Sequence, residues 1–501
     1  MGIKKYFASK DNTITNSFKS NLLTRGTGSN MGAADILETF VIHGQTSASL
    51  SQAPSAGNAN AAEQSRFIIQ FPISNISSDM AAGILPNNSG SLKFHLNLYN
   101  APHGDSTPLD FTLDLKMLSQ SWTEGRGLDM DNYTDLGVSN WISSSAGNSW
   151  SQEGGSYLTG TKTSASISFP TGLENVSLDV TDQVYKWLGA TNNYGFMLKF
   201  PDSVVSGSES LYTKKFFGRT SEFYFYRPTL EARWDSTRRD NRGNFYISSS
   251  IAPAADNLNT LFLYNVVRGQ LTNIPGLSNN KLKVEIYSGS TGPTGSPLFV
   301  TNTNGVSVNQ VTAGLLIENG NTVTGVYTAS YASTSSYDNV FDVWWTGSAP
   351  RIEYHTGSYE PISVATTNLL NDVVYLTNIT NLDNSYTKGQ KPKLRVFVRN
   401  KDWSPNIYTV ANTTVKTTII ENAYYSVFRS IDNLEIIPFG TGSSNNNFSR
   451  LSYDVSGNYF ELDTSCLEPG YMYGIKFAYY LQGEYREQPE VFKFKIEEDD
   501  V

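Results

Sequence analysis

Apolar and polar residues alternate in short runs along the chain, and turn-forming residues separate the runs. Residues 92–99 alternate with a period of two, which places every second side chain on one face of a strand. Residues 67–71 form a largely apolar run, and Pro72, which suits a strand end, follows directly. Similar runs recur at 109–118, 196–200, 261–265, 282–287, 341–345, 394–398, 434–437 and 492–496. This pattern predicts an all-β protein.

The composition favours strands over long helices. Charged residues make up 17% of the chain, against about 25% in an average soluble domain, and aromatic residues reach 13%. Ser, Thr, Asn and Gly fill most polar positions, and these residues suit strands and turns more than helices. One short helix is predicted at residues 179–188, where Val180, Val184 and Trp187 share one face and Gly189 can end the helix.

The length of 501 residues predicts about two to four domains, at roughly 100–200 residues each. The polar and turn-rich segment 233–243 is predicted to be a linker after the first domain. Residues 325–332 and 471–478 resemble each other weakly, as late strands of two related sandwiches would. We therefore predict tandem β-sandwich domains: one over residues 1–237 and two Ig-like sandwiches over 238–366 and 367–501.

The charge distribution argues against nucleic-acid binding. The net charge is −9, and the nearest approaches to a basic run are Lys4–Lys5 and Arg238–Arg239. A nucleic-acid groove needs clustered Lys and Arg to neutralise phosphates. No run of about 18 apolar residues occurs, so we expect no membrane insertion.

Cysteine usage and the N-terminal residues indicate a compartment. Cys466 is the only cysteine, so no disulfide can form within the chain, and this favours a reducing compartment. Residues 1–8 lack the apolar core of a signal peptide. We therefore expect synthesis in a cytoplasm.

The sequence contains no local motif for catalysis. The four histidines, His43, His95, His103 and His355, lack the spacing of a zinc site. Neither a phosphate-binding Walker loop nor the Gly-x-Ser-x-Gly elbow of hydrolases occurs. A Ser–His–Asp triad assembled in space would leave no such local signature. On this basis we predict that the protein is not an enzyme.

The densest acidic loop contains Asp129, Asp131 and Asp135. Oxygen ligands at alternating positions can hold calcium, which is the one cofactor that the sequence suggests. An EF-hand would need Gly at its sixth position and Glu at its twelfth, where this chain has Thr134 and Asn140. The loop is therefore not an EF-hand, and it is either another kind of calcium site or a solvated turn.

Three tryptophans, Trp122, Trp141 and Trp150, occur close together in a glycine-rich stretch. Exposed aromatic rings on a sandwich can stack on the apolar face of a sugar, which makes these residues candidates for glycan binding. Buried packing under long loops is the commoner role of tryptophan. Both alternatives remain open at the level of sequence.

About the first 235 residues carry short motifs in a distinctive order. They are Asp11 to Ile14, Asn30-x-Gly32, Ser65-Arg66, Trp122-Thr123-Glu124-Gly125, Trp150, Gly154-Gly155, Leu178-Asp179-Val180-Thr181, Asn193-Tyr194-Gly195-Phe196 and Phe217-Gly218-Arg219. This order resembles the DNRLRE-type β-sandwich, a jelly-roll related to carbohydrate-binding modules. The resemblance implies a jelly-roll for residues 1–237. Ser156 stands where relatives often carry Asp, which weakens an inherited ligand site.

The opening residues 1–16 and the region 240–264 look like parts of virion structural proteins of marine tailed phages, especially myoviruses of cyanobacteria. This resemblance implies a structural component of the neck, tail or capsid exterior, made in the host cytoplasm and present in the virion as a homo-oligomer or in many copies. Its partners would be other virion proteins. The alternative is a receptor- or glycan-binding fibre that uses the N-terminal sandwich. Residues 1–16 are either an anchor on a neighbouring subunit or the first strand of their own sheet.

Overall fold

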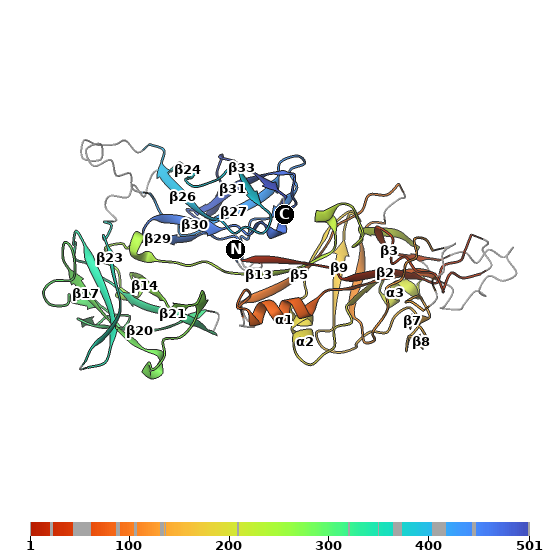
Figure 1. The fold of residues 1–501 in the computed structure, drawn as a ribbon, viewed down its shortest axis with the longest axis horizontal. Helices are drawn as coiled ribbons and strands as arrows, with labels where there is room; N and C mark the ends of the chain where they lie inside the picture. The colour runs from red at the N-terminus through yellow and green to blue at the C-terminus, as the bar shows by residue number, and fades with distance from the viewer. Residues whose placement is uncertain are drawn as a thin grey trace. The chain divides into compact units, whose positions relative to one another are not determined.

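The computed structural model describes residues 2–20, 24–43, 62–86, 91–104, 108–130, 135, 137–207, 210–318, 321–348, 350–363, 373–402, 417–442 and 447–498. Its internal contacts divide the chain into two compact units. One unit is Ile3–Trp234, and the other comprises Asp235–Val501 together with Met1–Gly2. Strands dominate both units (Figure 1), so the predicted all-β class is confirmed.

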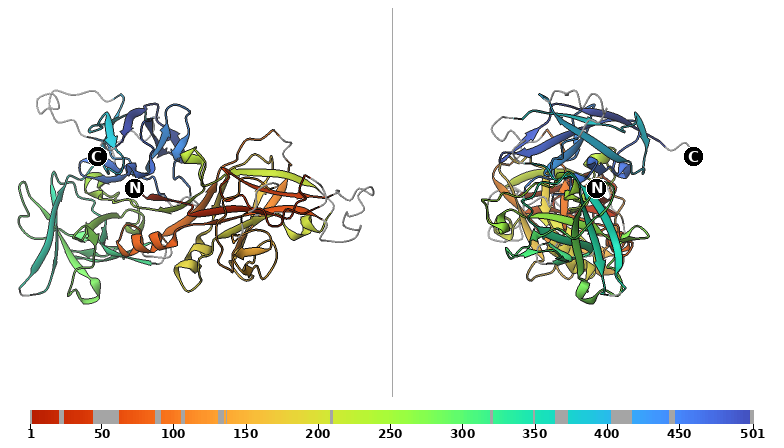
Figure 2. Two further views of the ribbon diagram at one scale, coloured as in Figure 1. Left: turned by 45° about the vertical axis from the view of Figure 1, so that its right-hand side comes forward. Right: turned by 90° about the vertical axis from the view of Figure 1, so that its left-hand side faces the viewer.

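The unit Ile3–Trp234 is a sandwich of two antiparallel sheets, seen from further sides in Figure 2. The four-stranded sheet has the order β1 (Ile3–Phe7), β13 (Thr229–Trp234), β5 (Leu92–Leu98), β10 (Val176–Asp179). The other sheet has the order β12 (Leu211–Phe217), β3 (Ile36–Ile42), β4 (Glu63–Gln70), β11 (Phe196–Lys199), β6 (Phe111–Met117), β9 (Ser164–Phe169), and β2 (Lys10–Thr15) also pairs with β4. Apolar side chains of both sheets form one buried core. This is the predicted N-terminal jelly-roll.

The helices of the jelly-roll are short. The predicted helix is confirmed as α2 (Thr181–Leu188), and Gly189 is its C-cap. The sequence pattern missed α1 (Ile73–Ala81), which buries only Ile73 and Ile76 and therefore shows a weak apolar stripe. A single turn, α3 (Asp202–Val205), follows β11. None of the helices in the described part of the chain has the length and apolar character needed to span a lipid bilayer.

The N-terminal residues belong to the jelly-roll itself. β1 pairs with β13 over its full length, and Tyr6 is buried in the core. β2 pairs with β4 from Lys10 to Thr15. Of the two alternatives for residues 1–16, the structure therefore supports the strand and not the anchor. Deleting residues 1–10 would remove β1 and expose the core beneath it.

The second sandwich is built from one continuous sheet that curves around its core. The order is β14 (Asn259–Tyr264), β21 (Asn321–Tyr331), β20 (Val311–Glu318), β17 (Leu282–Ser288), β22 (Val340–Thr346), β23 (Ile352–Tyr359). β20 pairs with β17 through residues 311–313 and with β21 through residues 314–318, so it joins the two layers. Leu261, Val284, Tyr327 and Trp344 meet in the core.

The third sandwich has two separate sheets. One has the order β24 (Tyr375–Ile379), β26 (Lys393–Asn400), β30 (Gly457–Glu461), β29 (Ser452–Asp454). The other has the order β25 (Ser385–Thr387), β33 (Phe492–Glu497), β31 (Met472–Leu481), β27 (Ala423–Arg429), β28 (Glu435–Ile437), with β32 (Glu484–Glu487) also on β31. The first order corresponds to strands A, B, E and D of an immunoglobulin sandwich.

The chain is thus a tandem of β-sandwiches, a jelly-roll followed by two Ig-like sandwiches. The two weakly similar segments lie largely in β21 and β31, and each of these strands is paired on both sides in its sheet. The contact-defined units meet between Trp234 and Asp235. The division into domains at 1–237, 238–366 and 367–501 stays a prediction.

Candidate functional site

The three tryptophans proposed for sugar stacking are buried. Trp122, Trp141 and Trp150 expose 4%, 5% and 5% of their surfaces. Trp122 and Trp150 belong to a small second core of the jelly-roll, on the outer side of the seven-stranded sheet. The other fully buried members of this core are Ile68, Leu118 and Met197. The loop that carries the tryptophans therefore covers that side of the sheet.

The ring N–H groups of two of these tryptophans are also occupied. Trp122 Nε1 and Trp150 Nε1 each donate a 2.8 Å hydrogen bond to a backbone carbonyl. The guanidinium of Arg66 lies 4.8 Å from the centroid of Trp141 and donates a 2.9 Å bond to the carbonyl of Gly154. Burial lowers the pKa of Arg66 to about 10. These contacts favour the structural alternative, and glycan binding by the three rings stays an untested prediction.

The predicted calcium loop is only partly described, because Asp131 lies outside the described residues. Asp129 is exposed, and Asp135 Oδ2 accepts a 2.9 Å hydrogen bond from the backbone N–H of Arg126. Within the described part of the chain, no group of three or more His, Cys, Asp or Glu side chains could hold a metal ion. Calcium at Asp129, Asp131 and Asp135 therefore stays a prediction, and the bond to Arg126 fits the solvated-turn alternative.

Three motif residues that are far apart in sequence meet in the jelly-roll, and we call Asp11, Glu124 and Arg219 the Asp11 network. Asp11 Oδ2 accepts a 2.5 Å hydrogen bond from the backbone N–H of Arg219. Glu124 accepts bonds of 3.2 and 2.9 Å from the Arg219 guanidinium and one of 2.8 Å from the Asp11 N–H. Beside it, a Cβ atom on Gly125 would collide with the side chain of Asn30. The network and its glycine thus fasten the tryptophan loop to β2.

The charge of Asp11 is incompletely compensated. Asp11 is 1% exposed, and its Oδ1 has no hydrogen-bond partner among the described residues. The nearest cationic nitrogen is Arg219 Nε, at 3.9 Å from Oδ1. Burial raises the pKa of Asp11 to about 7, although the contacts with Arg219 oppose this rise. Asp11 therefore changes its protonation state near neutral pH.

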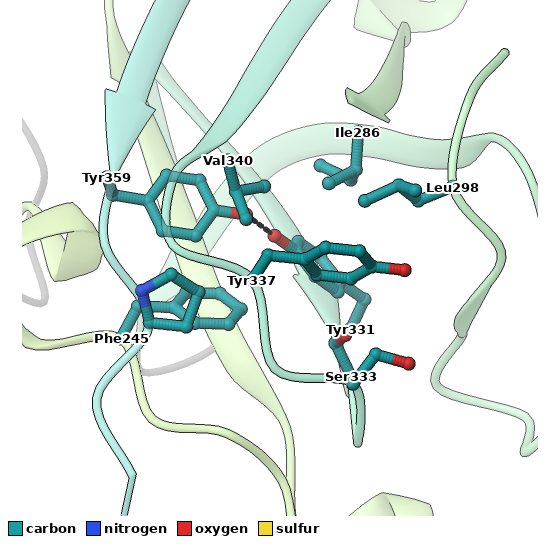
Figure 3. Close-up of a pocket in the computed structure, with 10 residues that line it drawn as sticks. Phe245, Ile286, Leu298, Tyr331, Ser333, Tyr337, Val340 and Tyr359 are labelled. Atoms are coloured by element: carbon teal, nitrogen blue, oxygen red, sulfur yellow. Dashed lines mark hydrogen bonds between the residues drawn. The ribbon is translucent and has the colours of Figure 1, made fainter. Parts of the chain in front are cut away.

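A small apolar pocket lies inside the second sandwich (Figure 3). Tyr331 and Tyr359 point toward each other there and share a hydrogen bond between their hydroxyls, with Phe245 beside them. Burial raises the pKa of both hydroxyls, so neither is an accessible base at neutral pH. The pocket has room for about one water molecule. It is a packing feature and too small for an organic ligand.

The predicted linker is not a free loop, and we call its residues 235–244 the clasp. Asp240 N–H donates to the Tyr453 carbonyl at 3.0 Å, and Tyr453 N–H donates to the Arg238 carbonyl at 3.0 Å. These bonds place the clasp along β29, at the edge of a sheet of the third sandwich. Arg450 and Asp235 form a 2.7 Å ion pair at the start of the clasp. A segment that is polar in sequence is thus fixed by backbone pairing.

The other end of the clasp enters the second sandwich through Arg242. Its Nε and Nη2 donate to the two carboxylate oxygens of Asp342 at 2.9 and 2.5 Å. Trp344 Nε1 donates to Asp342 Oδ2 at 2.5 Å, and Arg242 Nη1 also reaches Asp240 at 2.9 Å. Burial alone would lower the pKa of Arg242, but its bonds to Asp342 outweigh burial and raise it. A fully compensated buried ion pair therefore joins the clasp to β22.

A groove with a volume of about 510 Å³ lies along the clasp, within the unit Asp235–Val501. One wall is the outer face of β14 and β21, with Thr260, Thr328 and Ser330. Thr260 Oγ1 and Ser330 Oγ are 2.8 Å apart and share a hydrogen bond. The opposite side includes Arg239 of the clasp and Glu421 of the third sandwich. No sequence motif marks this groove, because its residues are up to about two hundred positions apart.

Comparisons with known proteins add no function. No protein-family model matches the sequence, and no curated protein matches it. Among solved structures, the chain is similar to a chimeric titin Z1Z2-Z1Z2 tandem functionalised with an exogenous GRGDS peptide from fibronectin. That match covers 48% of this chain and 91% of the titin chain, with 11% identity and a TM-score of 0.15. A TM-score this low carries no argument, so the fold assignment rests on the strand order described above.

Proposed function

We propose that the protein is a non-enzymatic structural component of a virion, in the neck, tail or capsid exterior, and that it acts through protein–protein contacts. The clasp is the observation that carries this proposal. Its pairing with β29 and the Arg242–Asp342 ion pair hold two sandwiches to one segment. Preorganised surfaces bind a neighbour at a lower entropic cost than surfaces joined by a free linker. A structural part of a particle benefits from such preorganisation.

An edge strand of the second sandwich supports the same role. Among the described residues, β23 pairs only with β22, and Ile352 and Tyr354 expose 51% and 36% of their surfaces. Unpaired edges readily meet strands or side faces of neighbouring proteins. A register shift at Tyr354 interrupts the ladder, and bulges of this kind restrain indiscriminate edge-to-edge aggregation. The edge is thus suited to a selective neighbour, either another virion protein or a second copy.

Analysis of purified particles tests the proposal. Quantitative mass spectrometry of particles from the virus that encodes the chain should detect the intact protein at a constant, multi-copy stoichiometry. A particle map should then place it against portal, sheath or capsid proteins. Intact protein that is abundant in infected-cell lysate and absent from purified particles would refute the virion assignment. A location at a distal fibre tip would instead favour the receptor-binding alternative.

The alternative function is a receptor- or glycan-binding fibre that uses the jelly-roll. The burial of Trp122, Trp141 and Trp150 weighs against this use, because a sugar ring would need an open aromatic face. The alternative predicts that the conservative change Trp141→Phe abolishes glycan binding without loss of stability. A structural role of Trp141 predicts the reverse: Trp141→Phe lowers the free energy of unfolding, and neither the wild type nor the variant binds a glycan through this loop.

A further inference from the structure

We infer that the groove along the clasp is a binding site for a small neutral oligosaccharide. This inference goes beyond the structural role proposed above and does not depend on it. The groove, at about 510 Å³, falls in the range of roughly 300–1,000 Å³ that is typical of small-molecule sites. It lies in the unit Asp235–Val501, whereas the buried tryptophans that the sequence suggested belong to the unit Ile3–Trp234.

The wall of the groove formed by β14 and β21 matches the polar groups of a sugar. Thr260, Thr328 and Ser330 are half-buried and present hydroxyls, each of which can donate one hydrogen bond and accept others. Because successive strand residues point to opposite faces, Thr328 and Ser330 project from the same face of β21. Thr260 lies directly opposite Ser330 in the antiparallel pair. Three neighbouring hydroxyls on one sheet face can bind several vicinal hydroxyls of a sugar at once.

The groove also offers apolar surface beside these hydroxyls. Phe262 is next on the same face of β14, and Leu316 lines the groove from β20. The C–H groups of a sugar ring need such surface, while its hydroxyls need donors and acceptors. A purely apolar ligand would cut the half-buried Thr328 hydroxyl off from water, and would leave the remaining hydrogen-bonding capacity of the Thr260–Ser330 pair unused.

The charged groups of the groove disfavour anionic ligands. Arg239 supplies N–H donors and Glu421 supplies an acceptor. The guanidinium of Arg239 already lies 3.7 Å from the carboxylates of Asp235 and Glu318, so a phosphate or other anion would find its charge compensated and would meet the Glu421 carboxylate. Glu421 is held in place by a 2.7 Å hydrogen bond from Asn244 Nδ2. A neutral ligand with many hydroxyls can use both groups without repulsion from either.

The clasp fixes the two sides of this site before a ligand arrives. Tyr453, which lines the groove, donates a 2.6 Å hydrogen bond to Asn241 Oδ1 of the clasp. Arg239 N–H donates to the Tyr264 hydroxyl at 2.7 Å, so the clasp is also tied to β14. Binding to such a preformed site avoids much of the entropic cost of ordering loops. The clasp therefore joins the two sandwiches and also holds the groove in a shape that is ready to bind.

The test uses the full-length protein on an array of neutral oligosaccharides and bacterial surface polysaccharides, followed by calorimetric titration with the strongest binder. Thr328→Trp fills the groove and should weaken binding at least about tenfold. Thr324→Trp is the matched control, because Thr324 lies on the same strand, is exposed and does not line the groove. It should leave the affinity unchanged.

Glu421→Gln is a second variant, which keeps the shape of the side chain and an oxygen that can accept from Asn244. It should weaken binding severalfold even if Thr328→Trp disturbs the fold. The inference is overturned if no saccharide on the array binds, or if a saccharide binds equally to the wild type, Thr328→Trp and Glu421→Gln. Detection of the protein in particles bears only on the structural role, so the two proposals fail separately.

Discussion

Asp11 in the jelly-roll and Asp342 in the second sandwich are both buried carboxylates, with 1% and 0% of their surfaces exposed. Both oxygens of Asp342 accept hydrogen bonds from the Arg242 guanidinium, and Oδ2 accepts a further bond from Trp344. Asp11 receives one bond on Oδ2, whereas its Oδ1 has no partner among the described residues. The two carboxylates are therefore buried almost equally, but hydrogen bonds replace the lost water at both oxygens of Asp342 and at only one oxygen of Asp11.

The difference shows that two carboxylates buried to the same degree can differ in how far their hydrogen-bond partners replace water. The bidentate arginine at Asp342 replaces the lost hydration with two charge-assisted bonds. At Asp11 the guanidinium of Arg219 is directed to Glu124, and burial raises the pKa of Asp11 to about 7. The bonds to Asp342 raise the pKa of Arg242, so the guanidinium stays charged, while the Asp11 network responds to pH.

The largest effect is expected for Arg242→Ala. This change removes the guanidinium and leaves the Asp342 carboxylate buried without its charge partner. Breaking a buried pair from one side costs about 3–5 kcal/mol. Urea unfolding of the full chain should show this loss in the transition of the unit Asp235–Val501, and hydrogen exchange should speed up in the clasp.

Two further variants test whether the loss comes from the buried charge. Replacing both partners, as Arg242→Met with Asp342→Leu, should recover much of the stability, because no uncompensated charge remains. Arg395→Ala breaks a 2.7 Å ion pair with Asp454 in which both side chains are partly exposed, and it should cost only about 0–1 kcal/mol. Equal losses for Arg242→Ala and Arg395→Ala would contradict the distinction between the two kinds of pair.

The second prediction concerns the pH dependence of the jelly-roll. The folded-state pKa of Asp11, about 7, lies above the ordinary value of 3.8, so the native state binds more protons than the unfolded state between these values. The stability contributed by Asp11 is therefore complete below about pH 4 and is lost as the pH rises through about 7. The full shift corresponds to at most about 4 kcal/mol.

Comparison with Asp11→Asn isolates this contribution from the other titrating groups. His95 acts with the opposite sign, because burial lowers its pKa to about 4 and its contribution grows as the pH rises toward 6.5. Urea unfolding of both proteins between pH 5 and pH 8 should show a wild-type stability that falls relative to the variant as the pH rises. A difference that stays constant over this range would mean that Asp11 is ionised throughout.

The sequence could predict the local elements and not the two ionic sites. The alternating runs at 92–99 and 282–287 became β5 and β17, and the helix at 179–188 became α2, because burial on one face imposes a local period. Arg242 and Asp342 are 100 positions apart, and Asp11 and Glu124 are 113 apart. No local pattern records such pairs, since only the fold brings them together.

The candidate sites show the same limit. The tryptophan cluster was visible in sequence, but whether Trp122 and its neighbours face water depends on how their loop lies on the sheet. The segment 233–243 looked like a linker because its residues are polar, and the same polarity supplies the hydrogen bonds of the clasp. Its aromatic partner, Tyr453, is more than two hundred positions away. Composition shows that a segment needs polar partners, and it does not show whether water or protein provides them.

The smallest effect is expected for Glu124→Gln, which alters the Asp11 network without removing Asp11. The Glu124 carboxylate is one of the groups that raise the pKa of Asp11, although its contribution is smaller than that of burial. The substituted amide keeps an oxygen for the Arg219 guanidinium and removes the negative charge. The pKa of Asp11 should therefore fall by less than one unit, and one unit corresponds to about 1.4 kcal/mol. The loss of stability with rising pH should begin at a lower pH.

Glu222→Gln is the matched control, because Glu222 is an exposed residue of the same jelly-roll. The pH series of urea unfolding used for Asp11→Asn measures the change. If Glu124→Gln moves the transition to a higher pH, Glu124 acts on Asp11 mainly by positioning Arg219, and the electrostatic account of the network is wrong.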